Sequence, residues 1–123
     1  MKILLLIGTG SFIGGIFRYL LTQSVQTKYF SAFPFGTLTV NIIGCFFIGI
    51  VFGVAAKTNL TQEWRLFLAT GLLGGFTTFS AFSAETFDLF KGGHFLYASA
   101  YILASVFLGL SATYLGNATT KII

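Results

Sequence analysis

The chain has 123 residues, and 55% of them are hydrophobic while only 8% carry a charge. A soluble domain has about 25% charged residues, so this chain lacks the polar surface that keeps a globule in water. The net charge is +4, but the seven Lys and Arg residues are scattered singly, which excludes the basic runs of a nucleic-acid-binding protein. We therefore expect one all-α membrane domain that covers the whole chain, 1–123.

The first apolar stretch is compatible with either a signal peptide or a membrane span. Lys2 followed by Ile3 and its apolar neighbours resembles the start of a signal peptide. The stretch continues to Leu21, however, which is too long for a signal-peptide core, and no A-x-A-like cleavage site follows. We interpret it as the first of four spans, each close to the ~20 residues that cross ~30 Å of hydrocarbon. The predicted spans cover residues 3–22, 36–56, 64–87 and 95–115.

Basic residues are distributed almost evenly between the two sides of this predicted domain. Four spans place both termini on one side, which carries Lys2, Lys57, Arg65 and Lys121, and leave Arg18, Lys28 and Lys91 on the other. The positive-inside rule needs an excess on one side, so it assigns no orientation here. The chain therefore either inserts both ways, with two copies paired about a two-fold axis in the membrane plane, or takes a fixed orientation from another signal.

The third predicted span is unusual because three glycines in five positions are followed by a run of hydroxyl and phenyl side chains, from Gly71 to Ser83. Gly and β-branched Thr are poor helix formers, so we predict a break in the helix near residues 74–78. Broken backbone at membrane depth occurs only where it is buried in protein or lines a cavity, and its free carbonyls can hold a cation. The alternative is an unbroken, glycine-rich helix that packs closely against its neighbours.

The polar side chains inside the predicted spans are almost all neutral. They are Asn41 in the second span, Thr77, Thr78, Ser80 and Ser83 in the third, and Tyr101, Ser105, Ser111 and Thr113 in the fourth. No His or Lys lies in mid-membrane for a proton relay, and Ser80 has no neighbouring His, so we do not expect an enzyme. Amides and hydroxyls donate hydrogen bonds, and the edge of a phenyl ring is positive. With Phe79 and Phe82 near one helical face, this inventory favours an anion pathway.

Two other functions remain open at this point. A small multidrug antiporter also has four spans and dual topology, but it needs a carboxylate embedded in the membrane. Glu85 is the only acid near a predicted span interior, and it lies close to the end of that span. A structural or assembly subunit without transport is the second alternative, and it would leave the neutral donors of the second and third spans without a purpose.

Over nearly its whole length the chain resembles the Fluc (CrcB) fluoride channels. The resemblance rests on three ordered motifs, GGIFRY at 14–19, PFGTLTVNIIG at 34–44 and GGFTTFSAFSAE at 74–85. It implies an antiparallel, dual-topology homodimer with two fluoride pores and one structural Na⁺ at the centre. It also implies passive export of cytoplasmic fluoride, which protects the cell. The absence of a targeting peptide suits a bacterial inner membrane. The chain departs from the family in having Ala81 where Thr is frequent and Cys45 where Ser is frequent.

The resemblance also implies a role for individual residues. The carbonyls of Gly74 and Thr77 in both copies are expected to hold the Na⁺. The expected residues of the fluoride pore are Asn41, Phe79, Ser80, Phe82, Tyr101, Ser105 and Thr113. Arg18 is expected near the aqueous opening of the pore.

Overall fold

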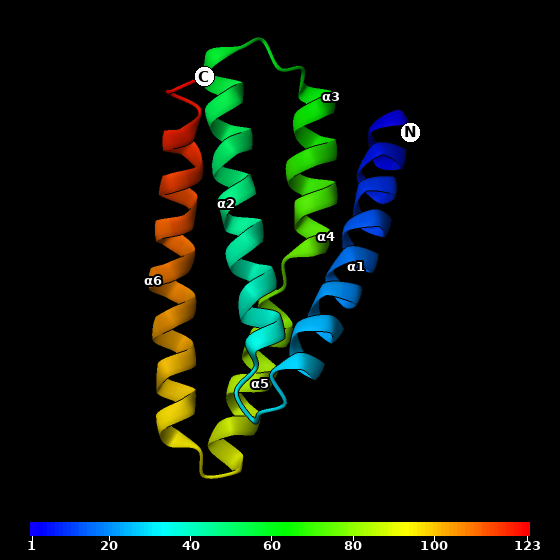
Figure 1. The fold of residues 1–123 in the computed structure, drawn as a ribbon. Coiled ribbons are helices and arrows are strands. Elements are labelled where there is room, and N and C mark those ends of the chain that lie inside the picture. Colours follow the sequence, from blue (N-terminus) through cyan, green and yellow to red (C-terminus); the bar gives the residue numbers. More distant parts are fainter.

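A computed structural model describes the whole chain, residues 1–123, as helices without a β-strand (Figure 1). The elements in chain order are α1 (Lys2–Lys28), α2 (Phe35–Lys57), α3 (Gln62–Arg65), the π-helix η1 (Leu66–Leu73), α4 (Gly74–Phe76), α5 (Phe79–Lys91) and α6 (Phe95–Thr119). The segments α3, η1, α4 and α5 follow one another in the chain and together form one span, Gln62–Lys91, in which α5 is displaced from the line of α3 and α4 (Figure 1). Both termini lie at the same end of the bundle (Figure 1).

The structure confirms four helices that are long and apolar enough to cross a membrane. The third of these helices covers Gln62–Lys91. The helices extend beyond the predicted apolar stretches; α1, for example, continues past Thr22 to Lys28. The difference arises because backbone hydrogen bonds continue a helix into the polar interface, whereas the sequence prediction ended where the side chains became polar.

The connection between α1 and α2 is fixed by one polar side chain, Gln26. Its Nε2 donates to the carbonyls of Ser31 and Phe33 at 3.0 and 3.1 Å, and its Oε1 accepts from the Gly36 N–H at 3.0 Å. The last of these bonds satisfies an amide in the first turn of α2, which has no partner within the helix. Gln26 therefore sets where α2 begins.

The helices form two closely packed pairs, α1 with η1 and α4, and α2 with α6. Glycine makes the close approach possible in each pair. A Cβ atom at Gly14 of α1 would overlap the Leu72 carbonyl, and one at Gly116 of α6 would overlap the Phe46 carbonyl. The backbones of each pair are therefore in direct contact.

We expect the Gly116→Ala substitution to lower the stability of the protein by about 1–3 kcal/mol, because the added methyl group forces α6 away from α2. The measurement is the unfolding temperature in detergent micelles. Gly8→Ala is the matched control, since nothing lies within 4 Å of a Cβ at that position. Equal unfolding temperatures for the two variants would contradict the packing described here.

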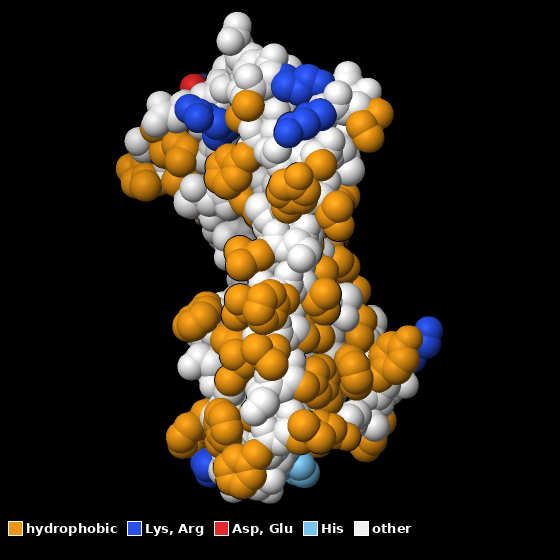
Figure 2. All heavy atoms as spheres, turned by 90° about the vertical axis from the view of Figure 1, so that its left-hand side faces the viewer, with side chains coloured by type: hydrophobic (Ala, Val, Ile, Leu, Met, Phe, Trp, Pro, Cys, Tyr) orange, Lys and Arg blue, Asp and Glu red, His pale blue; other side chains and the backbone are white.

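Only 18 of the 123 residues are buried, and most large apolar side chains point outward. Figure 2 shows apolar side chains over the middle of one face and a group of Lys and Arg side chains at its upper end. An apolar exterior between charged ends is what a lipid bilayer solvates.

Candidate functional site

The third span is broken where the sequence predicted it. Thr77 (φ −87°, ψ 158°) and Thr78 (φ −151°, ψ 119°) are both extended. The last helical bond before the break runs from Thr77 N–H to the Leu73 carbonyl at 2.9 Å. Helix α5 then begins with Thr78 as its N-cap, whose Oγ1 accepts from the Ala81 N–H at 3.1 Å. Thr is a favoured N-cap residue, so this restart has a local cause in the sequence.

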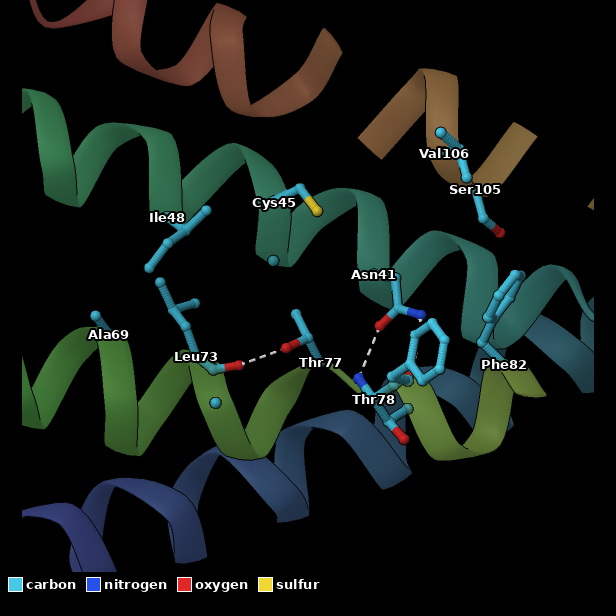
Figure 3. A pocket seen from close by; sticks show the side chains of 13 residues that line it. Asn41, Cys45, Ile48, Ala69, Leu73, Thr77, Thr78, Phe82, Ser105 and Val106 are labelled. Atoms are coloured by element: carbon cyan, nitrogen blue, oxygen red, sulfur yellow. Dashed lines mark hydrogen bonds between the residues drawn. The ribbon is translucent and has the colours of Figure 1, made fainter. Parts of the chain in front are cut away.

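The backbone of the break is held by Asn41 of α2. Its Oδ1 accepts from the Thr78 N–H at 2.9 Å, and its Nδ2 donates to the Thr78 carbonyl at 3.1 Å (Figure 3). A side-chain amide has two donor hydrogens, so one N–H of Asn41 remains for another acceptor. The sequence predicted Asn41 as a pore donor, but it did not predict this contact with the break.

A cavity of ≈ 450 Å³ lies beside the break, between α2, the third span and α6. Its lining includes six of the predicted site residues, which come from three spans: Asn41, Gly74, Thr77, Phe79, Phe82 and Ser105. Cys45, a free cysteine, also lines it, and no charged residue does. The cavity therefore offers neutral donors and phenyl rings.

Ser105 of α6 is the least satisfied polar residue of this cavity. Its hydroxyl is buried and has no hydrogen-bond partner within the chain. Figure 3 shows the side chain directed from α6 toward the space beside Asn41 and Phe82. A buried hydroxyl without a partner is costly, so its presence calls for an explanation.

The two phenyl rings of α5 lie close together but differ in exposure. The ring centroids of Phe79 and Phe82 are 5.5 Å apart with the planes tilted by 51°, and Phe82 also lies 5.0 Å from the Tyr101 ring. Phe82 is partly buried, whereas Phe79 is 78% exposed in the single chain. Most of the Phe79 side chain is therefore accessible to a second molecule.

Glu85 is an acid inside the third span, and two hydroxyls hold it. Thr37 Oγ1 donates to Glu85 Oε2 at 2.8 Å, and the Tyr101 hydroxyl donates to Oε1 at 2.8 Å. Tyr101 is fully buried and does not line the cavity, so its hydroxyl is committed to this carboxylate. Sequence reasoning did not place Glu85 and Thr37 in the site. The available signal was that an acid within a span requires a partner.

We expect Tyr101→Phe to destabilise the protein by about 1–3 kcal/mol, because the carboxylate loses one of its two side-chain donors. The unfolding temperature in detergent measures this effect. Tyr97→Phe is the control, because Tyr97 also lies on α6 and its hydroxyl makes no hydrogen bond within the chain. If both substitutions lower the unfolding temperature equally, the Glu85 contact contributes nothing.

The remaining predicted residues lie outside the cavity. Arg18 Nε donates to the Gly75 carbonyl at 3.1 Å, so its charge lies at the C-terminal end of α4, where the helix dipole favours a cation. Ser80 is exposed, with its Oγ 3.2 Å from Thr78 Oγ1. Thr113 Oγ1 donates to the Gly109 carbonyl of its own helix at 3.2 Å, and the Thr113 backbone packs against Gly49 of α2.

The predicted cation ligands, the carbonyls of Gly74 and Thr77, meet the first requirement of such a site. In a continuous helix they would accept from the amides of Thr78 and Ala81, but both of these amides donate to side chains instead. No group of three or more His, Cys, Asp or Glu side chains exists elsewhere for a metal. The two carbonyls therefore have no helical donor, and free carbonyls at a helix break are groups that can hold a cation.

Comparison with known proteins agrees with this architecture. A family model described as CrcB-like protein, Camphor Resistance (CrcB), matches residues 5–117. A protein of Geobacter sulfurreducens named fluoride-specific ion channel FluC is 49% identical over 117 residues, which is 94% of each chain. Proteins of the same name are 44% identical in Phocaeicola vulgatus, over 94% of this chain and 96% of that one, and 39% identical in Azobacteroides pseudotrichonymphae, over 98% of both. The chain is a multi-pass membrane protein that belongs to the CrcB-like family.

Proposed function

We propose that the chain is a fluoride-selective ion channel that exports cytoplasmic fluoride passively and thereby protects the cell. The observation that carries this proposal is the buried, unpartnered hydroxyl of Ser105 in a cavity without charged residues. The names of the relatives, fluoride-specific ion channels, support the same ion. They are channels rather than enzymes, in agreement with the expectation from the sequence.

Fluoride is small and strongly hydrated, so it leaves water only where donors replace its hydration shell. Ser105 and the free N–H of Asn41 supply strong donors, and the ring edges of Phe79 and Phe82 supply weaker positive contacts. A fixed Lys or Arg in the cavity would bind the anion too tightly for release, whereas conduction needs weak binding at several points. A narrow slot lined by these groups would exclude the larger chloride ion.

The functional unit that we propose is an antiparallel homodimer. The Phe79 ring and the Gly74 backbone, both part of the candidate site, are exposed in the single chain, and α5 packs mainly against α6 and weakly against α2. A second copy would complete the wall of the cavity and cover this face. The even distribution of Lys and Arg permits insertion in both orientations, as such a dimer requires.

We further propose that the Gly74 and Thr77 carbonyls of both copies hold one Na⁺ at the centre of the dimer. The cation would offset the negative ends of carbonyl dipoles that have lost their helical partners. Export then follows from acid chemistry, because hydrogen fluoride enters a cell uncharged and dissociates at the higher internal pH. Because the cell interior is electrically negative, a passive pore in the bacterial inner membrane would let the trapped anion leave the cell.

Fluoride efflux from liposomes that hold the purified protein tests this proposal. A fluoride electrode records efflux, and a K⁺ ionophore compensates the charge that moves. Fast fluoride efflux that requires the ionophore, without chloride efflux, is the expected result.

The same assay separates the channel from a proton-coupled exchanger, which the carboxylate of Glu85 inside the third span would favour. A fluoride efflux rate that is the same with and without the ionophore but depends on a pH gradient would support the exchanger. No efflux from folded protein would support a structural subunit.

A further inference from the structure

The two carbonyls of the proposed sodium site are the two whose helical donors have been taken by side chains. The Thr78 N–H, which would close the helix on the Gly74 carbonyl, donates to Asn41 Oδ1 at 2.9 Å. The Ala81 N–H, which would close it on the Thr77 carbonyl, donates to Thr78 Oγ1 at 3.1 Å. In each case one side-chain oxygen accepts the amide hydrogen, and the carbonyl is therefore left without its helical donor.

We infer that Asn41 and Thr78 are positioning residues for the cation: their oxygens capture the two amides that would otherwise occupy its carbonyl ligands. The inference rests on the proposed function, in which the carbonyls of Gly74 and Thr77 bind Na⁺. Neither side chain touches the ion in this scheme. Both act through the backbone of the break.

Asn41 fixes the extended backbone of the break from both sides. It accepts from the Thr78 N–H and donates to the Thr78 carbonyl at 3.1 Å, as a neighbouring β-strand would. Arg18 engages the Gly75 carbonyl, which lies between the two proposed ligands, at 3.1 Å. Side chains thus occupy the carbonyls of Gly75 and Thr78, whereas the carbonyls of Gly74 and Thr77 accept from no side chain.

All of these contacts lie within one copy of the chain. The conformation of the break therefore needs no contact from a second copy or a cation, and a cation would not have to break helical bonds in order to bind. Preorganisation of this kind raises affinity, because the cost of reaching the binding-competent state has already been met. If these amides were not held by side chains, they would compete with the cation for the two carbonyl oxygens.

The test compares paired variants that either keep or remove the capturing oxygen. Thr78→Val and Asn41→Leu remove it at nearly constant volume, whereas Thr78→Ser keeps an acceptor in reach of the amide. Thr86→Val is the control for loss of a threonine hydroxyl, because Thr86 Oγ1 only donates to the Phe82 carbonyl within α5. Bound ²²Na⁺ is measured on the purified full-length protein in lipid nanodiscs, and fluoride efflux is measured on the same preparations.

We expect Thr78→Val and Asn41→Leu each to lower the Na⁺ affinity by about tenfold, which corresponds to the loss of one to two hydrogen bonds. Thr78→Ser and Thr86→Val should bind Na⁺ like the unchanged protein. Unchanged affinity in both Thr78→Val and Asn41→Leu would overturn the inference and leave the channel proposal standing. Sodium binding with the expected variant pattern but without fluoride efflux would support the inference and refute the channel. Absence of Na⁺ binding in the unchanged protein would overturn the inference.

Amide hydrogen exchange on the unchanged protein provides a test that does not depend on whether the variants fold. Side-chain capture predicts that the Thr78 and Ala81 amides exchange slowly in Na⁺-free buffer, because Asn41 and Thr78 engage them without the cation. Fast exchange of both amides without Na⁺, with protection only after Na⁺ is added, would contradict the inference.

Discussion

Ser105→Ala is expected to lower fluoride efflux by about 10- to 100-fold while leaving the protein as stable as before or slightly more stable. A hydrogen bond to an ion contributes about 1.5–3 kcal/mol, and each 1.4 kcal/mol is a tenfold change. The hydroxyl has no partner within the chain, so its removal takes away no internal bond and relieves a buried unpaired group. A decrease in fluoride efflux with no decrease in stability would indicate that the Ser105 hydroxyl contacts the ion and does not stabilise the fold.

Two measurements establish this result, the liposome efflux rate and the unfolding temperature in detergent. Ser99→Ala is the control, because Ser99 lies on the same helix but is exposed and does not line the cavity. It should change neither quantity. If Ser105→Ala lowers stability and flux together, the hydroxyl has a structural partner and the proposed pore contact is wrong.

Phe79→Ile and Phe82→Ile are each expected to lower fluoride efflux by about tenfold. Both rings line the cavity, and isoleucine keeps an apolar side chain there but has no positive edge to present to an anion. Phe82→Ile should also loosen the contact with Tyr101, whose ring lies 5.0 Å away, whereas the exposed Phe79 ring contacts Phe82 and not Tyr101. Phe79→Ile is therefore the cleaner test of the ring itself.

The matched control for both substitutions is Phe87→Ile. Phe87 lies on the same helix, is 62% exposed and does not line the cavity. Its replacement should leave efflux unchanged in the same liposome assay. Unchanged efflux in Phe79→Ile would remove the ring-edge contact from the mechanism, although the hydroxyl and amide donors would remain.

The sequence predicted the architecture well because the relevant quantities are local. Hydropathy is summed over about 20 neighbouring residues, and four such sums exceed the threshold for a membrane span. Helix propensity is equally local, and the glycines and threonines at 74–78 indicated a break that the structure has at Thr77 and Thr78. The π-helix of η1 was not predicted, because its leucines carry no local signal that distinguishes a π-turn from an α-turn.

The candidate site was only partly predictable. The sequence showed the residue types of an anion pathway and the three motifs of the family. The match to the family model confirms the resemblance. The sequence alone therefore determined the number of spans, the position of the break and the neutral character of the polar residues.

Only the tertiary structure decided which of these residues meet. The glycine contacts between α1 and the third span, and between α2 and α6, set how closely the helices approach and which faces they share. That geometry pairs Asn41 with Thr78 across the bundle, commits Tyr101 and Thr37 to Glu85, and places Thr113 outside the cavity. A hydrogen bond requires two atoms within about 3 Å, and in a helical bundle that distance depends on packing between spans rather than on neighbours in the sequence.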